Sequence, residues 1–187
     1  MKARPAKQSG SVTLELNRRD DPLLEAAART GGKSPFSLKK ILVPIDFSVC
    51  SKKALQYALP LAKEHQAALT LLHVIAPAYQ MGGEYAGIDY AALQAGIKTG
   101  CERELAELAA SEVPDEVPAT TVVQVGAPSH EIVAAARKLG ADLIVIATHG
   151  RTGLKHVFLG SVVEHVVQRA PCPVLVVRER EREFIEA

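Results

Sequence analysis

Residues 141–177, ADLIVIATHGRTGLKHVFLGSVVEHVVQRAPCPVLVV, decide the fold of this chain. The apolar run ADLIVIAT is followed by a loop with glycine at positions 150, 153 and 160, then by the segment SVVEHVVQRA and the apolar run PVLVV. Short runs rich in β-branched residues on either side of a longer helical segment predict strand, helix and strand. The stretch therefore predicts one strand–helix–strand unit with a glycine-bearing loop.

The same alternation extends back toward the N-terminus. KKILVPIDF, ALTLLHVI and TTVVQVG read as three earlier strands. A helical segment follows each of them. The first begins after Ser48, a residue suited to cap a helix, the second ends near Ser111, and the third is SHEIVAAARKLG. Nearly continuous apolar strands that alternate with helices predict an α/β fold, an open five-stranded parallel sheet with helices on both faces.

Such sheets bind ligands outside the carboxyl ends of their strands, where the strand order reverses. If the first strand is central, VPIDF at its end and IATHG at the end of the fourth strand flank this crevice. The loop after the fourth strand is then a candidate binding site.

Composition limits the partners of the chain. It has 187 residues, 48% of them hydrophobic, which is enough for one domain with an appendage. The formal net charge is +1 and aromatic residues make up 4%, so neither a long-range field that steers the chain onto nucleic acid nor a base-stacking platform is indicated. We expect a domain over residues 38–178, an N-terminal extension over 1–37 that is flexible, and a charged tail over 179–187.

The location that we expect is the cytoplasm. No signal peptide or membrane-spanning run is present, which argues against a membrane partner. The three cysteines form no Cys-x-x-Cys pair and suggest neither zinc nor a disulfide framework. We interpret Cys172, between two prolines, as structural.

The glycine-bearing loop leads into a helix that starts near Ser161. A helix N-terminus attracts phosphate through its unpaired N–H groups and its dipole. Gly160, Ser161 and Val162 could supply these groups, with Gly150 leaving room at the strand exit. The alternative is an ordinary loop, since glycine and serine are common where a strand leads into a helix. The sequences of a P-loop and of a G-x-G-x-x-G dinucleotide loop are absent.

At this point ILVPIDFS, LLHVI and ATHGRTGLKHVFLGSVVEHVVQRAPCPVLVV resemble the universal stress protein family over about residues 38–178. The ATP-binding subset of that family carries Gly, two residues, Gly, nine residues, then Gly and Ser or Thr. Gly150, Gly160 and Ser161 fit this pattern, whereas Ala147 stands in place of the first glycine. Alanine is harmful there only if the backbone is left-handed or touches the ligand closely, and a strand end does not predict positive φ.

The resemblance implies a Rossmann-like fold, similar to adenine nucleotide α-hydrolase-like proteins, with strand order 3-2-1-4-5. It also implies a bound adenine nucleotide, ATP or else AMP or ADP, with Mg²⁺ at the phosphates. Asp46 would contact the ribose, and the Val74 backbone would bind adenine. The full set of nucleotide-binding residues that we predict is Pro44, Ile45, Asp46, Val74, Ile146, Ala147, His149, Gly150, Gly160, Ser161 and Val162.

Several of these residues have a structural alternative. Asp46 could instead cap the first helix together with Ser48. A general-base role for His149 lacks a nucleophile and an orienting acid, so we predict no catalytic residue and no metal ligand on the protein. His73, within LLHVI, is expected to be a satisfied, partly buried strand residue.

The family commonly forms homodimers through the last strand, so Val174, Leu175, Val176 and Val177 are the predicted interface. The resulting hypothesis is a stress-response protein that acts as a nucleotide-dependent regulatory dimer, with slow ATP hydrolysis left open. Two alternatives remain: an enzyme that cleaves the α–β phosphate bond of ATP, disfavoured because PIDFSVCSKK has no glycine-rich loop, and a nucleotide-free interaction module. The protein partner is not predicted.

Overall fold

The computed structural model describes residues 2–5, 12–15, 37–77, 90–148 and 160–178. The chain divides into two compact units, residues 1–37 and Leu38–Ala187. In the first unit, β1 (Lys2–Pro5) pairs with β2 (Val12–Glu15) in a two-stranded antiparallel sheet. The sequence pattern had not indicated these strands.

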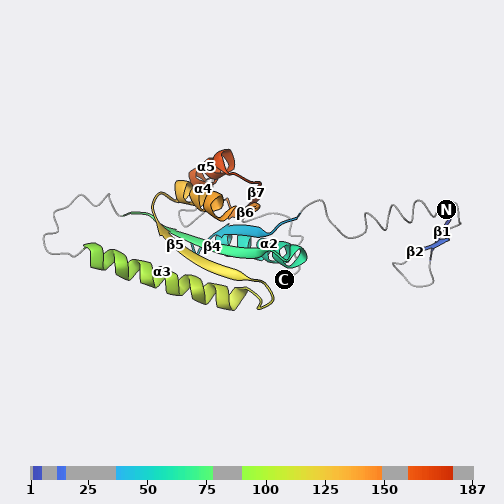
Figure 1. The fold of residues 1–187 in the computed structure, drawn as a ribbon, viewed down its shortest axis with the longest axis horizontal. Helices are drawn as coiled ribbons and strands as arrows, with labels where there is room; N and C mark the ends of the chain where they lie inside the picture. Colours follow the sequence, from blue (N-terminus) through green and yellow to red (C-terminus); the bar gives the residue numbers. More distant parts are fainter. Residues whose placement is uncertain (1, 6–11, 16–36, 78–89, 149–159, 179–187) are drawn as a thin grey trace. The chain divides into compact units, whose positions relative to one another are not determined.

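The second unit contains the five alternating strands and four helices that the sequence predicts (Figure 1). Most boundaries fall within a few residues of the expected ones. In chain order the elements are β3 (Lys40–Pro44), α2 (Val49–His65), β4 (Ala68–Ile75), α3 (Tyr90–Glu112), β5 (Ala119–Val125), α4 (Pro128–Leu139), β6 (Leu143–Ala147), α5 (Ser161–Arg169) and β7 (Val174–Val177).

The five strands form one parallel sheet in the order β5-β4-β3-β6-β7. Counted within this unit the order is 3-2-1-4-5, so the predicted Rossmann-like α/β fold and strand order are confirmed. The first strand is central, and the order reverses between β3 and β6. The crevice expected for a ligand lies at this reversal.

Helices cover both faces of the sheet (Figure 1). Side chains of successive strand residues alternate between the faces, so Ile41 and Val43 pack on one side and Leu42 on the other. The first layer packs against α2 and α3, and the second against α4 and α5. Strands buried on both faces explain why their sequences are continuous apolar runs.

Pro44 controls where β3 separates from β6. The N–H of Ile45 donates to the Leu72 carbonyl of β4 at 2.8 Å, so Pro44, one residue earlier, faces β6. Proline has no N–H to donate there. The β3–β6 register accordingly covers Ile41 and Leu42, whereas the β3–β4 register continues to Pro44. The central strands therefore part near their carboxyl ends.

The opposite end of the same strand pair is tied together by Asp142. Its Oδ2 accepts the backbone N–H groups of Lys39 at 2.8 Å and Lys40 at 2.9 Å. These are charge-assisted hydrogen bonds that join the start of β3 to the residue before β6. They fix the register of two strands that are about a hundred residues apart in sequence.

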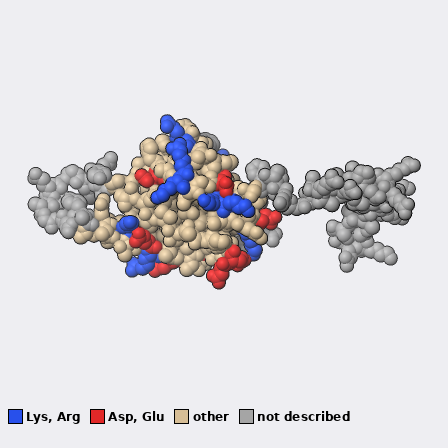
Figure 2. Space-filling view, in the orientation of Figure 1, with Lys and Arg blue, Asp and Glu red and all other residues tan. Residues whose placement is uncertain are grey.

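The surface charge is mixed. On the face shown in Figure 2, basic and acidic side chains are interspersed over the described surface. Within the described residues, no helix combines the length and apolar character needed to cross a membrane.

Replacing Asp142 tests this tie between the strands. We expect Asp142→Ala to lower the free energy of unfolding by about 1–2 kcal/mol, because two backbone N–H groups lose a charged acceptor. Urea denaturation of the full chain measures the change. Asp115→Ala, at an exposed position, is the control and should change it by less than about 0.5 kcal/mol. Equal effects for the two variants would contradict the structural role of Asp142.

Candidate functional site

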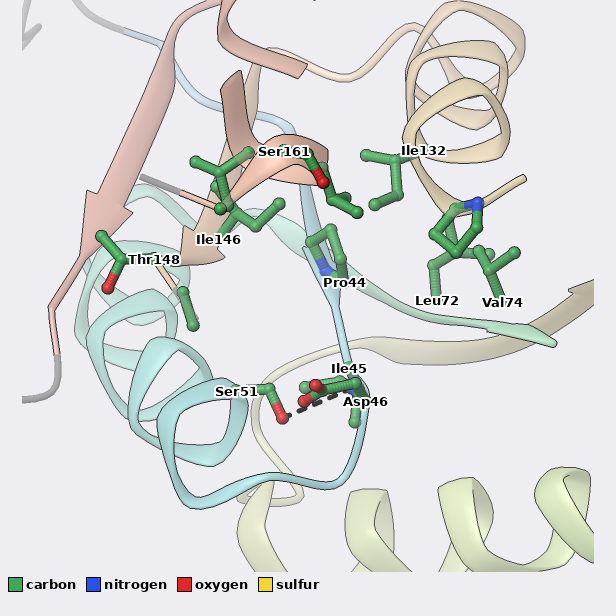
Figure 3. A pocket seen from close by; sticks show the side chains of 15 residues that line it. Pro44, Ile45, Asp46, Ser51, Leu72, Val74, Ile132, Ile146, Thr148 and Ser161 are labelled. Carbon is green, nitrogen blue, oxygen red and sulfur yellow. Dashed lines mark hydrogen bonds between the residues drawn. The ribbon is translucent and has the colours of Figure 1, made fainter. Parts of the chain in front are cut away.

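A cavity of about 290 Å³ lies at the carboxyl ends of the central strands, where the strand order reverses (Figure 3). Its walls come from the ends of β3, β4 and β6, from the first turns of α4 and α5, and from α2. The residues that line it are Pro44, Ile45, Asp46, Ser51, Leu72, Val74, Pro128, Ile132, Ile146, Ala147, Thr148, Gly160, Ser161, Val162 and Val163.

The cavity gathers most of the residues that the sequence predicts for a site. Nine of the eleven line it, although they come from segments more than a hundred residues apart. The other two, His149 and Gly150, lie outside the described residues. The sequence reasoning missed Ser51, Leu72, Pro128, Ile132, Thr148 and Val163.

One wall of the cavity is apolar. Leu72, Ile132, Ile146 and Val163 are buried and belong to the same hydrophobic layer, between the sheet and helices α4 and α5. Val74 packs against this layer from the end of β4. The wall offers a flat organic ring a surface from which water is excluded.

Asp46 lies at the opposite, polar side of the cavity (Figure 3). Its Oδ1 accepts the N–H of Ser48 at 3.1 Å and the Ser48 hydroxyl at 2.6 Å, while its own N–H donates to the Ser51 hydroxyl at 3.4 Å. The alternative interpretation of Asp46, a capping interaction with Ser48, is therefore present in the structure. It is compatible with ligand binding, because a carboxylate has about four acceptor sites and the side chain also lines the cavity.

Ser48 caps α2 as the sequence predicts. Its backbone is extended, and its hydroxyl accepts the N–H of Ser51 at 3.2 Å. The cap fixes the direction in which the chain leaves β3, and with it the position of Asp46.

The backbone of β4 faces the crevice at Val74. The Leu72 carbonyl accepts the N–H of Ile45 from β3 at 2.8 Å, and the Ile75 carbonyl accepts the N–H of Gly126 after β5 at 3.0 Å. Because successive residues direct their backbone groups to alternate sides, Val74 directs its N–H and C=O toward β3. The β3–β4 register ends at Pro44 and Leu72, so these groups face the open crevice.

The N-terminus of α5 closes the cavity on the β6 side. Gly160 is the N-cap and has no side chain with which to cap the N–H groups of the first turn. Its φ is −69°, so positive φ does not explain the glycine. Its N–H donates to the Thr148 carbonyl at 3.2 Å, and an added Cβ would lie 3.1 Å from that oxygen. Close approach to the chain itself thus favours glycine at this position.

Ala147 ends strand β6 with ordinary strand geometry. The described residues with positive φ are Phe47, Gln66 and Gly140, so Ala147 does not need the freedom of glycine. It pairs with Val177 and lines the cavity. The expectation that this strand end does not have positive φ is confirmed.

Two residues that the sequence assigned structural roles behave as expected. His73 is buried, and its Nδ1 hydrogen-bonds the Ile45 carbonyl at 2.7 Å. Cys172 is not among the residues that line the cavity. Burial, and to a lesser extent the Asp142 carboxylate, raises the pKa of the Cys172 thiol and so disfavours the reactive thiolate.

Fold and site together define the class: a doubly wound α/β domain with a ligand-sized cavity at its strand-order reversal. The model of the universal stress protein family matches residues 37–178. Universal stress protein YxiE of Bacillus subtilis is 39% identical over 145 residues, which cover 74% of this chain and 98% of that protein. The chain belongs to the universal stress protein family.

Solved structures agree with this assignment. The structure of MJ0577, a universal stress protein of Methanocaldococcus jannaschii, superimposes with a TM-score of 0.67 at 30% identity, covering 78% of this chain and 99% of that one. A universal stress protein solved in complex with cAMP gives a TM-score of 0.56 at 24% identity, covering 76% and 98%. The second likeness shows a shared fold.

The Ser48 cap provides a test of the local structure. We expect Ser48→Ala to lower the free energy of unfolding by about 1 kcal/mol, because α2 loses its cap and Asp46 loses a hydroxyl donor. Chemical denaturation measures the loss. Ser48→Thr keeps a hydroxyl and should retain most of the stability. An alanine variant as stable as the wild type would show that this cap is not needed.

Proposed function

We propose that this domain binds an adenine nucleotide, with ATP as the working ligand, and acts in stress adaptation as a nucleotide-dependent regulatory dimer in the cytoplasm. One observation carries the proposal: the same cavity combines an apolar wall, exposed backbone groups, a carboxylate and a helix N-terminus. Each matches a different part of a nucleotide. That a universal stress protein of the same fold was solved with cAMP supports the choice of ligand class.

The base would occupy the apolar side of the cavity. A purine is flat and largely apolar, so packing against Leu72 and Ile132 removes it from water. The polar edge of adenine has both a donor and an acceptor. The Val74 N–H and C=O, which face the crevice, offer the complementary pair without any side-chain contribution.

The ribose would lie between the base and the tip of β3. Its two hydroxyl groups are donors that a carboxylate can accept, and Asp46 is the carboxylate among the residues that line the cavity. The capping bonds from Ser48 hold this carboxylate in place before the ligand arrives, and the backbone N–H of Asp46 donates to the Ser51 hydroxyl. Such preorganisation lowers the entropy cost of binding.

The phosphates would bind at the start of α5. Gly160, Ser161 and Val162 line the cavity, and the first N–H groups of this nine-residue helix have no side-chain cap from Gly160. His149 and Gly150 would complete this side. The described residues hold no cluster of three metal-ligand side chains, so Mg²⁺ would bind mainly to phosphate oxygens and water.

Binding alone would provide the signal, since we assign no catalytic residue. All three cysteines are thiols rather than disulfides, which fits the reducing compartment that we propose.

The dimer would form through β7, which lies at an edge of the sheet. The carbonyls of Pro173 and Val177 accept N–H groups from β6 at 3.1 Å and from the residue after it at 2.8 Å. The alternation of the strand therefore directs the backbone groups of Val174 and Val176 away from the sheet. Among the described residues no other strand pairs with this edge, and an edge of this kind can pair with a second copy of the chain.

Nucleotide binding is tested by isothermal titration calorimetry and thermal shift with ATP and Mg²⁺, with adenosine as a second ligand. We expect wild-type protein to bind ATP, and Ser161→Glu to bind it at least about tenfold more weakly, because a carboxylate at the helix start repels phosphate. Adenosine, which lacks phosphate, should bind the variant nearly as well as the wild type.

Ser161→Gln is the matched control, because the glutamine side chain has nearly the same size as glutamate but carries no charge. This variant should bind ATP clearly more tightly than Ser161→Glu does, because it lacks the repelling charge. A negative charge at this position favours the helix itself, so a loss of ATP affinity would not reflect unfolding. Absence of any response of the wild type to millimolar ATP would refute the proposed function. Equal binding by the Glu and Gln variants would remove the start of α5 from the phosphate site.

The dimer is tested by replacing Val176 with proline. Val176→Pro removes an outward N–H while leaving the bond of the Val177 carbonyl in place, so we expect monomers in sedimentation velocity where the wild type sediments as a dimer. Val176→Thr keeps the N–H and should remain dimeric. A wild-type monomer at micromolar concentration would contradict the proposed dimer.

A further inference from the structure

The hydrogen bonding between β3 and β4 changes at Ile45. Its N–H makes a regular bond to the Leu72 carbonyl at 2.8 Å. In a continued parallel ladder, the Ile45 carbonyl would next accept the N–H of Val74. That bond is not present among the backbone bonds of the described residues. The Ile45 carbonyl instead pairs with Nδ1 of His73 at 2.7 Å.

A buried side chain thus takes the place of a backbone donor. His73 is 9% exposed, and because it alternates with Leu72 and Val74 along β4 its side chain lies on the face of the sheet opposite the apolar wall of the cavity. Since a carbonyl oxygen only accepts hydrogen bonds, Nδ1 must carry the proton. The imidazole therefore donates to Ile45, and the neighbouring Val74 N–H is left facing the crevice.

The chain beyond Ile45 adopts a strained conformation that this arrangement supports. Phe47 has φ of +65°, which is unusual for a large side chain. Its ring packs against the His73 ring, with centroids 4.6 Å apart and planes tilted by 40°. His73 therefore contacts both sides of Asp46: the carbonyl of the residue before it and the ring of the residue after it.

We propose that His73 is a positioning residue of the site. It holds the Ile45 carbonyl away from Val74, so that the Val74 N–H remains available to the base, and it braces the turn that carries Asp46. The side chain does not itself line the cavity. The ligand part of this inference rests on the proposed nucleotide function, whereas the hydrogen-bond exchange at Ile45 does not.

Two substitutions of His73 distinguish the effect of a hydrogen-bond donor at the Nδ1 position from the effect of side-chain volume. His73→Leu introduces an apolar side chain of similar size that has no donor. His73→Asn instead places an amide N–H close to the Nδ1 position. In the leucine variant, the Ile45 carbonyl becomes free to accept the Val74 N–H. We expect ATP affinity to fall about tenfold, the loss of roughly one hydrogen bond, and the asparagine variant to recover most of it.

Amide hydrogen exchange of the nucleotide-free protein, followed by NMR, gives a readout that a purely structural role would not produce. We expect the Val74 amide of the wild type to exchange faster than that of Leu72, which lies within the β3–β4 register. In His73→Leu, the Val74 amide should become slower by about tenfold although the protein is less stable overall. In His73→Asn, it should stay fast.

The outcomes are distinguishable. If the wild type fails to bind ATP, the proposed function fails, but exchange at Val74 still decides whether His73 controls this N–H. If His73→Leu binds ATP as the wild type does and Val74 exchange is unchanged, the inference is overturned. Should the leucine variant not fold, His73→Gln, whose amide reaches the Nε2 position instead, is compared with His73→Asn. Equal behaviour of those two would also overturn it.

Discussion

The missing N–H of Pro44 is the constraint on which the site depends. A central strand in a parallel sheet normally bonds to both neighbours along its length, and such pairing would close the space between β3 and β6. Pro44 faces β6 at the point where the next bond would form, so pairing on that side covers Ile41 and Leu42 while pairing with β4 continues. At the reversal of strand order, the ends of β3 and β6 are therefore left unpaired, and the cavity lies there.

The segment after Pro44 is short, and side chains satisfy its backbone groups. Ser48 caps α2 and bonds to Asp46, while His73 donates to the Ile45 carbonyl. Phe47, with its positive φ, costs on the order of 1–3 kcal/mol, which the surrounding contacts must offset. Strain held in this way is typical of functional segments, because a relaxed strand would carry the chain past the crevice.

The opposite side of the cavity is built differently. Gly160 is favoured because an added Cβ would lie 3.1 Å from the Thr148 carbonyl oxygen, and this close approach brings the start of α5 to the tip of β6. The same glycine leaves the N–H groups of the helix without a side-chain cap. A packing requirement and an anion-attracting end therefore arise from one residue, which explains why glycine spacing alone could not distinguish an ordinary loop from a phosphate site.

Much of the cavity could be predicted because strand ends are recognisable in a sequence. Apolar runs that alternate with helices specify a parallel sheet, and a parallel sheet brings all carboxyl ends to one edge. The order of elements and the helix start at Ser161 were therefore readable from local properties, namely side-chain polarity and capping preference, whereas the unequal pairing of β3 with its two neighbours was not. Ile132 and Thr148 were not, since the first depends on how α4 rotates against the sheet and the second is a strand-end residue with no distinctive pattern. The family resemblance had named the Val74 backbone, but the donation from His73 to Ile45, 28 residues earlier in the chain, and the reason that the Val74 N–H is left facing the crevice emerge only in three dimensions. Those relations depend on the register between β3 and β4, which many residues fix together and no single motif records.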